Sequence, residues 1–310
     1  MDCNAFVEQQ VTEIKEVVGD AIAINALSGG VDSSVVTVLG HRALGDRLKT
    51  FFIDNALMRE GEPEHVVRMF EQMEIPVELV DARDEFLSAL EGVTDPEEKR
   101  QAITDTFYSG VFSRLVQQTG ARFLLHGTIL TDIEETVAGI KRQHNILAQV
   151  GIDPEEEYGY AVLEPLKTLR KDGVREVARV LGLPESVSNR MPFPGPALAT
   201  RIVGEVTEER LETVRAATAV VEEELADTGA FQYMAVLLND RATGIRDNRR
   251  EFGQIVVVRC IDSVDARTAT PVELPWEMLK RLCERITQIE GVNRCLYDLT
   301  PKPPAAIEYV

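Results

Sequence analysis

The chain has 310 residues, of which 44% are hydrophobic and 27% are charged, so it is long enough for one large domain and a smaller one. Its 33 basic and 52 acidic side chains give a formal net charge of −19, which argues against general nucleic-acid binding because phosphate contacts need clustered Lys and Arg. No stretch approaches the roughly 20 apolar residues of a membrane span, and the scattered cysteines lack CxxC spacing, so we expect a cytoplasmic protein with reduced thiols and no membrane contact.

The first half of the chain alternates helix and strand signals. Apolar spacing predicts helices at residues 5–18, 31–43, 64–73 and 95–119, and apolar runs predict strands at 21–27, 50–53, 76–80 and 122–126. This alternation is typical of an α/β fold with a parallel sheet covered on both faces by helices. Ligands of such sheets bind beyond the carboxyl ends of the strands, where Ser28 and Asp54 fall.

The second half contains two irregular segments and then a different pattern. Residues 129–160 show no clear period, which predicts a mobile lid or, alternatively, a partly helical insertion. The segment MPFPGPA at 191–197 predicts a stiff linker. Helical spacing at 207–226 and 275–288 and strand signals at 232–238, 254–259 and 294–299 then predict an α+β domain. We therefore expect a first domain at 1–190, a Pro-rich linker at 191–206 and a second domain at 207–310.

The stretch INALSGGVDSSV at 24–35 carries the strongest local signal. A glycine pair between a strand and a helix lets the backbone approach an anion, and the helix start offers free N–H groups, so the loop predicts a phosphate site. Neither a Walker lysine nor a GxGxxG pattern is present. In the place of the lysine stand Asp32, a carboxylate able to hold Mg²⁺, and the hydroxyls of Ser33 and Ser34.

These residues resemble the pyrophosphate loop of the ATP pyrophosphatases, which transfer AMP from ATP to a substrate oxygen. Further motifs are similar to those of the synthetase part of GMP synthase over nearly the whole chain. They are FFIDNALMREGE at 51–62, GVTDPEEKR at 92–100, HGTI at 126–129, LEPLKTLRKDGVRE at 163–176, NRMPFPGPALATRIVGEVT at 189–207 and KPPAAIEY at 302–309. No glutaminase region accompanies them, so the chain resembles the separate synthetase chain of a two-subunit enzyme.

The resemblance implies adenylation of XMP with ATP and Mg²⁺, followed by displacement of AMP by ammonia from a glutamine amidotransferase subunit. It also implies a homodimer formed through the C-terminal domain. The residues it assigns to ATP and pyrophosphate are Ser28, Gly29, Gly30, Val31, Asp32, Ser33, Ser34, Asp54 and Asn55. The implied catalytic residues are Asp32, Lys171 and Asp172, of which Asp32 and Asp172 would hold Mg²⁺. The implied acceptor-binding residues are Arg100, Arg201, Gln232, Lys302, Ile307 and Glu308, and the implied lid residues are Lys141, His144 and Asn145.

Several positions depart from the family pattern, mostly on the acceptor side. The lid has Gln143 in place of a histidine and Leu147 and Ala148 in place of glycines, while Ala197 replaces a glycine of the PFPGPGL motif. Two other functions therefore stay open. A paralogue could transfer AMP to another nucleotide or to a sulfur-accepting base, or the chain could be a non-catalytic ATP-binding regulatory subunit. Retention of Asp32, Lys171 and Asp172 argues against the latter, because a sensor needs no leaving-group chemistry.

Overall fold

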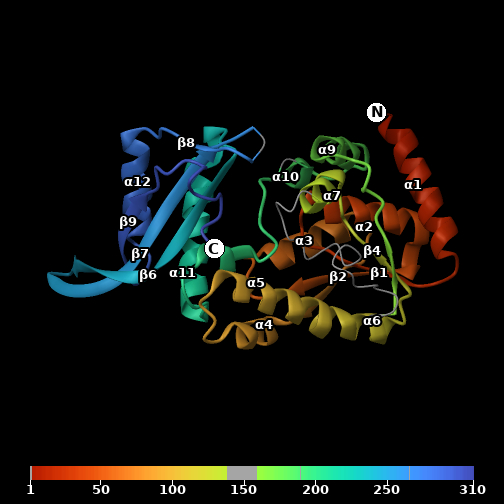
Figure 1. Cartoon of the computed structure of the whole chain (residues 1–310), viewed down its shortest axis with the longest axis horizontal. Coiled ribbons are helices and arrows are strands. Elements are labelled where there is room, and N and C mark those ends of the chain that lie inside the picture. The colour runs from red at the N-terminus through yellow and green to blue at the C-terminus, as the bar shows by residue number, and fades with distance from the viewer. Residues whose placement is uncertain (1, 138–158, 189, 265) are drawn as a thin grey trace. The chain divides into compact units, whose positions relative to one another are not determined.

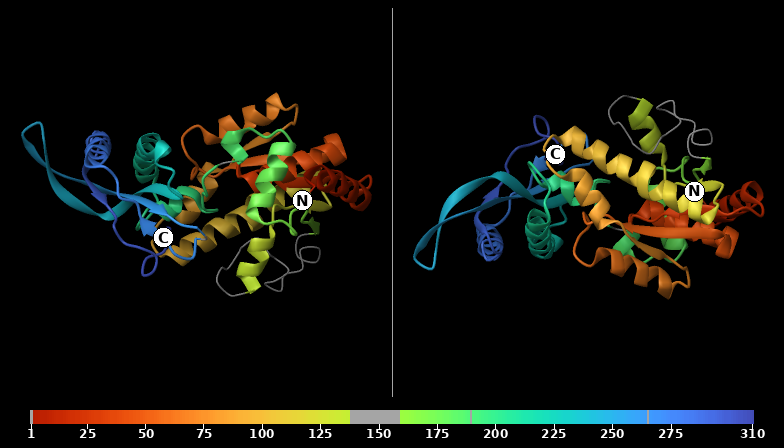
Figure 2. Two further views of the ribbon diagram at one scale, coloured as in Figure 1. Left: turned by 90° about the horizontal axis from the view of Figure 1, so that it is seen from above. Right: turned by 90° about the horizontal axis from the view of Figure 1, so that it is seen from below.

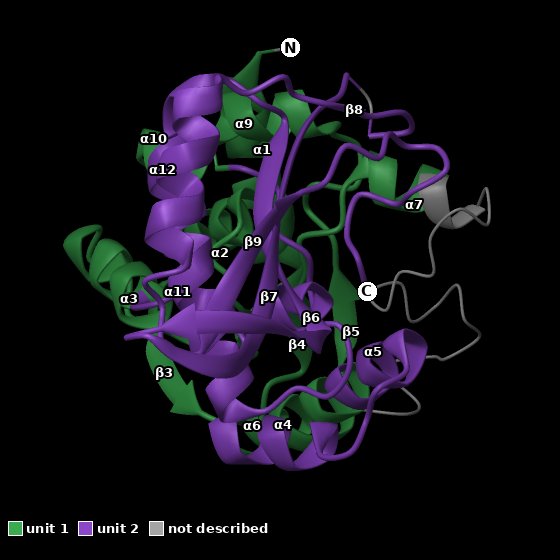
Figure 3. Ribbon diagram, turned by 90° about the vertical axis from the view of Figure 1, so that its left-hand side faces the viewer, with its two compact units in different colours: residues 1–54, 62–82, 104–190 green, residues 55–61, 83–103, 191–310 purple. Residues whose placement is uncertain are grey.

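The computed structural model describes residues 2–137, 159–188, 190–264 and 266–310. It divides into two compact units (Figure 3): unit 1 comprises residues 1–54, 62–82 and 104–190, and unit 2 comprises residues 55–61, 83–103 and 191–310. The candidate lid residues Lys141, His144 and Asn145 lie outside the described residues. No helix in the described ranges combines the length and apolarity needed to cross a membrane.

Unit 1 is built around a five-stranded parallel sheet with the order β3-β2-β1-β4-β5 (Figure 1). Its strands are β1 (Ala23–Ala26), β2 (Leu48–Asp54), β3 (Glu78–Asp81), β4 (Phe123–Leu125) and β5 (Ala161–Leu163). Side chains of β1 and β2 are buried at consecutive positions, as expected for strands covered on both faces. The predicted α/β fold with a parallel sheet is confirmed.

Helices surround this sheet. They are α1 (Cys3–Val18), α2 (Val31–Leu44), η1 (Gly45–Arg47), α3 (Glu62–Gln72), the π-helix η2 (Thr106–Phe112), α6 (Ser113–Thr119), α7 (Leu130–Val137), α9 (Lys171–Val180) and α10 (Glu185–Ser188). In Figure 1, α1, α2 and α9 lie on one face of the sheet and α6 on the other. A Cβ on Gly40 of α2 would lie 2.7 Å from a methyl group of Leu125, so glycine allows this helix to pack closely on the sheet.

Unit 2 contains a second, mostly antiparallel sheet with two helices on one face. Its elements are α4 (Arg83–Leu90), most of α5 (Pro96–Asp105), η4 (Ala197–Arg201), α11 (Glu208–Leu225), η5 (Ala226–Thr228), β6 (Gln232–Arg246), β7 (Arg249–Asp262), β8 (Thr270–Pro271), α12 (Trp276–Ile286) and β9 (Val292–Tyr297). β6 and β7 form a long hairpin, and β9 pairs with β7 in parallel. Both α11 and α12 lie on one face of this sheet (Figure 2). Met234, Val236 and Val257 form a core cluster in the sheet, and the half-buried Ile307 packs against it.

Local chemistry explains where several of these elements begin and end. Asp2 caps α1, because its Oδ1 accepts hydrogen bonds from two backbone N–H groups of the first turn at 3.1 Å each. Thr207 caps α11 through a 3.3 Å bond from the Arg210 N–H. Between β6 and β7, Asp247 and Asn248 both have positive φ, at 49° and 59°, which suits the tight turn of a twisted hairpin.

The segment expected to be a stiff linker is partly helical and partly buried in the structure. Its residues 197–201 form the short helix η4 and are buried. The Leu198 N–H donates to the carbonyl oxygen of Leu57, and Val203 pairs with Leu237 at the edge of β6. Unit 2 also includes residues 55–61 and 83–103, which the sequence pattern assigned to the first domain. The periodicity of strands and helices could not indicate this division, because the chain passes between the two units several times.

Candidate active site

The glycine-rich loop lies where the strand order of unit 1 changes direction. From β1 the sheet extends to β2 and β3 on one side and to β4 and β5 on the other, and the crevice at such a point is the usual ligand site of open α/β sheets. Residues 27–30 follow β1, and His126-Gly127-Thr128 follow β4. A Cβ on Gly127 would lie 3.2 Å from the backbone nitrogen of Ser33, so the two segments are in close contact.

The loop leaves the start of α2 open to an anion. Gly29 has a φ of 74°, in the left-handed region that favours glycine. Gly30 is the N-cap of α2, and among the described residues no side chain caps the first turn, so the positive end of the helix keeps N–H groups available. The Gly30 N–H itself donates to Ser28 Oγ at 3.4 Å. The Ser33 side chain stabilises the loop conformation. Its hydroxyl donates to the Gly30 carbonyl oxygen at 3.1 Å and lies 2.9 Å from Ser28 Oγ. Ser34 is fully buried.

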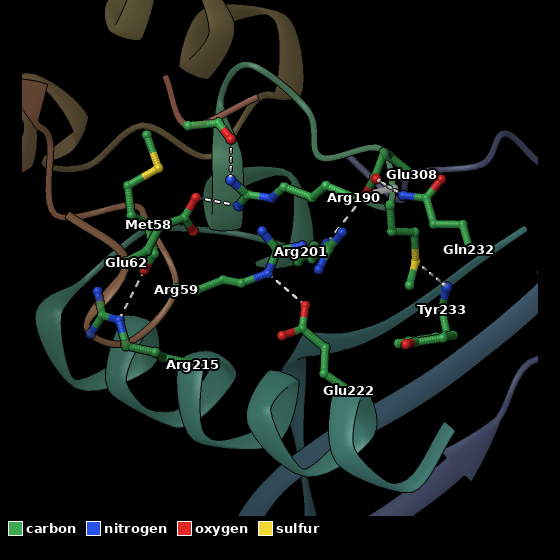
Figure 4. Close-up of polar contacts among 12 residues, drawn as sticks. Met58, Arg59, Glu62, Arg190, Arg201, Arg215, Glu222, Gln232, Tyr233 and Glu308 are labelled. Carbon is green, nitrogen blue, oxygen red and sulfur yellow. Dashed lines mark hydrogen bonds and ion pairs between the residues drawn. The ribbon is translucent and has the colours of Figure 1, made fainter. Parts of the chain in front are cut away.

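An arginine distant in sequence holds the peptide of Gly29. Arg190 Nη1 donates to the Gly29 carbonyl oxygen at 2.8 Å, and Nη2 of the same guanidinium is ion-paired with the buried Glu62 (Figure 4). A Cβ on Gly29 would lie 2.9 Å from Arg190 Nη1 and 3.0 Å from Val66 Cγ2. The positive φ therefore favours glycine at position 29, and a Cβ there would also displace the Arg190 guanidinium from the Gly29 carbonyl group. Sequence reasoning quoted both Arg190 and Glu62 within motifs but assigned them no role.

Buried polar side chains fix α2 to the sheet below the loop. Asn25 Nδ2 donates to Thr37 Oγ1 at 2.7 Å, and Thr50 Oγ1 donates to Asn25 Oδ1 at 2.7 Å. Thr37 Oγ1 in turn donates to the Ser33 carbonyl oxygen at 2.8 Å. This network joins β1, β2 and α2, and satisfied buried networks of this kind hold neighbouring elements in one arrangement. It therefore fixes the base of the loop.

Asp32 and Lys171, far apart in sequence, meet at the loop. Lys171 Nζ lies 2.7 Å from Asp32 Oδ2. Burial raises the pKa of Asp32, the charge of Lys171 opposes that shift, and the neighbouring carboxylate of Asp132 adds to it. Asp132 also caps the start of α7, because its Oδ2 accepts from the Ile129 N–H at 3.1 Å. The pattern around HGTI did not reveal Asp132 as part of this charged group.

The donor set beside the loop fits a magnesium ion. Asp32 Oδ1 is buried without a hydrogen-bond partner in the described part of the chain, and such an oxygen is available as a ligand. Mg²⁺ in phosphate-transferring sites is commonly held by one or two carboxylates together with substrate phosphates and waters. No group of three or more His, Cys, Asp or Glu suited to a metal occurs among the described residues, which that mode does not require. Asp172 is exposed in the first turn of α9, and Asp132 is the carboxylate that acts on Asp32.

His126 lies at the end of β4 close to these carboxylates. Its Nδ1 is 2.8 Å from Thr128 Oγ1, and its backbone N–H pairs with Leu163 of β5. Burial lowers the pKa of His126, against the opposing charges of Glu164, Asp132 and Asp32. The imidazole is therefore neutral near pH 7, and it acts here as a hydrogen-bonding group rather than as a cation.

In unit 2, three of the expected acceptor residues are in direct contact. Glu308 Oε1 accepts from Gln232 Nε2 at 2.7 Å, and Glu308 Oε2 lies 3.5 Å from Arg201 Nε (Figure 4). Thr200 Oγ1 lies 3.4 Å from the same Glu308 oxygen. The three contacts join η4, the start of β6 and the chain beyond β9. Residues separated by up to about a hundred positions thus form one polar cluster.

Arg201 is the most buried charge of this cluster. Its side chain is 1% exposed, and its Nη1 has no hydrogen-bond partner among the described residues. The Arg201 guanidinium lies 4.8 Å from the ring centre of Phe193, and that of Arg59 lies 3.8 Å from the same ring. Burial lowers the pKa of Arg201, although Glu308 opposes the shift. A buried guanidinium with an unused donor is suited to an anionic or carbonyl-bearing ligand.

The remaining candidates lie apart from that cluster. Lys302 Nζ donates to the Ala266 carbonyl oxygen at 2.8 Å, and Arg100 Nη2 donates to the Val310 carbonyl oxygen at 3.0 Å. Asp54 ends β2 in unit 1, whereas Asn55 belongs to unit 2, where its Oδ1 accepts from the Leu57 N–H at 3.0 Å. The structure thus joins some expected residues and gives others separate partners.

Comparison with known proteins gives matches over the whole length of the chain. A family described as NAD synthase matches residues 2–212, and one described as GMP synthase C terminal domain matches residues 219–309. The chain is 52% identical over 310 residues to a subunit of the glutamine-hydrolyzing GMP synthase of Archaeoglobus fulgidus, with 100% of both chains covered. Proteins with the same name from Pyrococcus horikoshii and Methanopyrus kandleri are 48% and 45% identical, with 100% and 99% of both chains covered.

Proposed function

The chain belongs to the same GMP synthase subunit family as these relatives, and we propose that it makes GMP from XMP, ATP and ammonia. In this reaction O2 of XMP attacks the α-phosphorus of ATP, an O–P bond forms, and pyrophosphate leaves. Ammonia then attacks C2 of the purine ring, and AMP leaves. The observation that carries the proposal is the open loop between β1 and α2, with Lys171 beside it. In the proposal this loop holds the departing pyrophosphate, so the bond that breaks is the one between the α-phosphorus and the oxygen that leaves with the β-phosphate.

The loop supplies electrostatic stabilisation to the departing pyrophosphate. Backbone N–H groups at Gly29 and Val31, at the positive end of α2, would meet negative charge that increases as the bond breaks, and the Gly30 N–H would exchange its 3.4 Å bond to Ser28 Oγ for a phosphate oxygen. The Lys171 ammonium adds a positive charge, and its partner Asp32 holds it near the loop. Arg190 and Glu62 keep the Gly29 peptide in the conformation that this binding needs.

We propose that Mg²⁺ accompanies ATP and is held by Asp32, with Asp132 or Asp172 contributing through bound water. When bound, the ion neutralises phosphate charge and so favours departure of pyrophosphate. Asp32 Oδ1, which has no hydrogen-bond partner among the described residues, supports this assignment. Between the two further carboxylates, Asp132 is favoured because it acts on Asp32, whereas Asp172 is exposed.

We assign the acceptor nucleotide to the polar cluster of unit 2. Arg201 brings a buried positive charge, and Gln232 and Glu308 bring an amide and a carboxylate able to bind the edge of a purine. Arg100, Lys302 and Ile307 complete the proposed set. The donors of Arg100 and Lys302 now bond to backbone carbonyl groups, which an XMP phosphate would replace as the stronger acceptor.

The proposed assembly has two kinds of partner. A separate glutamine amidotransferase subunit would deliver the ammonia, because the relatives' name calls each of them one subunit of a glutamine-hydrolyzing enzyme. A homodimer through unit 2 is supported by apolar side chains on one face of the β6–β7 hairpin, where Ile245 is 80% exposed and Phe252 63% exposed. We assign the protein to the cytoplasm, where these nucleotides are made. Sedimentation of the wild type against Ile245→Glu tests the dimer, since a charge on that face should give monomers.

One assay tests the function against its alternatives. Purified protein is incubated with ATP, Mg²⁺, ammonium and XMP, and AMP, pyrophosphate and GMP are measured. We expect the three products in equal amounts. AMP formed only with another nucleotide or with a sulfur-accepting base would support a paralogue instead. ATP binding without AMP formation under any acceptor would support a regulatory subunit, and either outcome would overturn the proposal.

A further inference from the structure

A buried arginine of unit 2 holds two separate points of the chain that follows β9. Arg259 lies on β7, is 0% exposed, and forms an ion pair with Asp298. Its Nη1 donates to the Thr300 carbonyl oxygen at 2.9 Å, and its Nη2 donates to the Ala306 carbonyl oxygen at 3.0 Å. One planar guanidinium therefore fixes both ends of the loop at residues 300–306.

Every acceptor candidate that follows β9 lies either between Thr300 and Ala306 in the chain or directly after Ala306. Lys302 lies inside the loop, and Ile307 and Glu308 follow Ala306 directly. Glu308 reaches Gln232 at 2.7 Å, so its position depends on where the chain leaves Ala306. Residues 298–310 contain no regular helix or strand, and such a segment takes its shape from side-chain contacts of this kind.

Asp298 completes the arrangement. Its Oδ2 accepts from the Tyr309 hydroxyl at 2.8 Å, and its Oδ1 accepts from the Thr300 N–H at 2.8 Å. Burial acts to raise the pKa of Asp298, but hydrogen bonds from Thr300 and Tyr309 and the charge of Arg259 lower it overall. Asp298 is therefore ionised near pH 7 and pairs with Arg259 as a carboxylate. Tyr309 adds a third point of attachment, on the far side of Glu308.

We propose that Arg259, with Asp298, is a positioning residue for the acceptor nucleotide. Arg259 fixes the conformation of residues 300–309 so that the side chains of Lys302 and Glu308 point toward the nucleotide. This inference rests on the proposed function, in which those residues hold XMP. Arg259 itself touches no substrate in this proposal. A lysine could not take its place, because one ammonium on a single stem lacks the planar fork that meets a carboxylate and two carbonyl groups together.

The test uses the full chain with Arg259→Lys and, as a matched control, Arg294→Lys. Arg294 is an exposed arginine of β9 that also donates to a backbone carbonyl, that of Thr243 at 3.2 Å. KM for XMP and KM for ATP are measured from the rate of GMP formation. Amide hydrogen exchange measures how well residues 299–308 are held in place. For Arg259→Lys we expect KM for XMP to rise about 10-fold, KM for ATP to change less than about 2-fold, and exchange across 299–308 to accelerate. The control should match the wild type.

Several outcomes would overturn the inference. An equal rise of both KM values would indicate a general structural role, and faster exchange with an unchanged KM for XMP would separate the segment from the acceptor. If Arg259→Lys does not fold, Tyr309→Phe removes a single hydrogen bond to Asp298 and should raise KM for XMP about 3-fold. If the wild type makes no GMP, the proposed function fails on its own. Unchanged exchange across 299–308 in either variant would then still refute the positioning role.

Discussion

The two units differ in the charges that they shield from solvent: a half-buried aspartate beside the loop of unit 1 and fully buried cations in unit 2. In unit 1 the loop carries Asp32, an anion whose buried Oδ1 has no hydrogen-bond partner among the described residues. In unit 2 the fully buried charged side chains are cations: Arg201, Lys99 and Arg259. A buried charge is costly unless it is paired, and an unpaired donor or acceptor that persists commonly marks a ligand site. The proposed function accounts for this difference by a metal-bound phosphate in unit 1 and an anionic nucleotide in unit 2.

The units also differ in how their sites are built. The unit 1 loop is short and local, and its shape comes from two glycines, a helix start and one arginine clamp. The unit 2 cluster draws its side chains from three segments far apart in the chain. The loop can therefore be found in the sequence as a motif, whereas the cluster is defined by packing contacts.

Substitution of Asp32 should have the largest effect and should fall on the ATP side alone. Asp32→Ala removes the partner of Lys171 and the candidate Mg²⁺ ligand, so AMP formation should fall by about 10³-fold or more. Thermal unfolding should change little, because the Asp32 side chain is 26% exposed and its ion pair with Lys171 is partly open to solvent. Asp172→Ala is the control and should be milder, since Asp172 is exposed. Undiminished turnover in Asp32→Ala would contradict the loop assignment.

Substitution of Arg201 should affect the acceptor side in the same selective way. Arg201→Met keeps most of the side-chain volume and removes a 1% exposed charge, so KM for XMP should rise about 100-fold while KM for ATP stays nearly constant. Replacement of a poorly paired buried charge by an apolar side chain commonly preserves stability, so the melting temperature should not fall. An equal rise of KM for ATP and for XMP would contradict the proposal that the two substrates bind to different units.

The buried Lys99 of unit 2 should make the free energy of unfolding depend on pH. It is 1% exposed, its Nζ donates to the Ile202 carbonyl oxygen at 2.8 Å, and burial lowers its pKa to about 8 from 10.5. Between these values the unfolded chain binds more protons than the folded chain, so the free energy of unfolding rises with pH. The stability contributed by this group is complete above pH 10.5 and is lost as pH falls through about 8.

Urea unfolding of the wild type and Lys99→Met at pH 7.5, 8.5 and 9.5 measures this contribution. Other titrating groups cancel in the difference between the two proteins. We expect the wild type to gain about 1 kcal/mol per pH unit relative to Lys99→Met above pH 8. A difference that does not vary with pH would show that the Lys99 amine titrates normally.

The smallest effect concerns Ala197, which stands where the family motif has glycine. Ala197 is fully buried and has a φ of 52°, a conformation that costs a residue with a Cβ about 1 kcal/mol. Ala197→Gly relieves this strain but loses a buried methyl group, so the free energy of unfolding should change by less than about 1 kcal/mol. Ala199→Gly, in the same short helix without positive φ, should cost about 1–2 kcal/mol. Equal losses in the two variants would show that Ala197 is unstrained.

Much of unit 1 could be predicted from the sequence, because its strands and helices carry strong local periodicity. The order of elements through β4 matches the predicted one apart from α4 of unit 2, and the region predicted as one helix at 95–119 comprises α5, η2 and α6. The strand β5 was not predicted, since three residues are too few for a periodic signal, and α4 is only eight residues long. The helix α7 lies at the start of the segment expected to be a lid.

The sequence by itself determined the residue types of both sites and the loop after β1, because a strand, a glycine pair and a helix start are local features of the chain. Only the tertiary structure decided which distant side chains meet. Lys171 reaches Asp32 and Arg190 reaches Gly29 across more than a hundred residues, and Arg201 meets Glu308 in the same way. Such pairs depend on how packed elements are arranged, which no local period encodes. The charge buried in each unit follows from that packing.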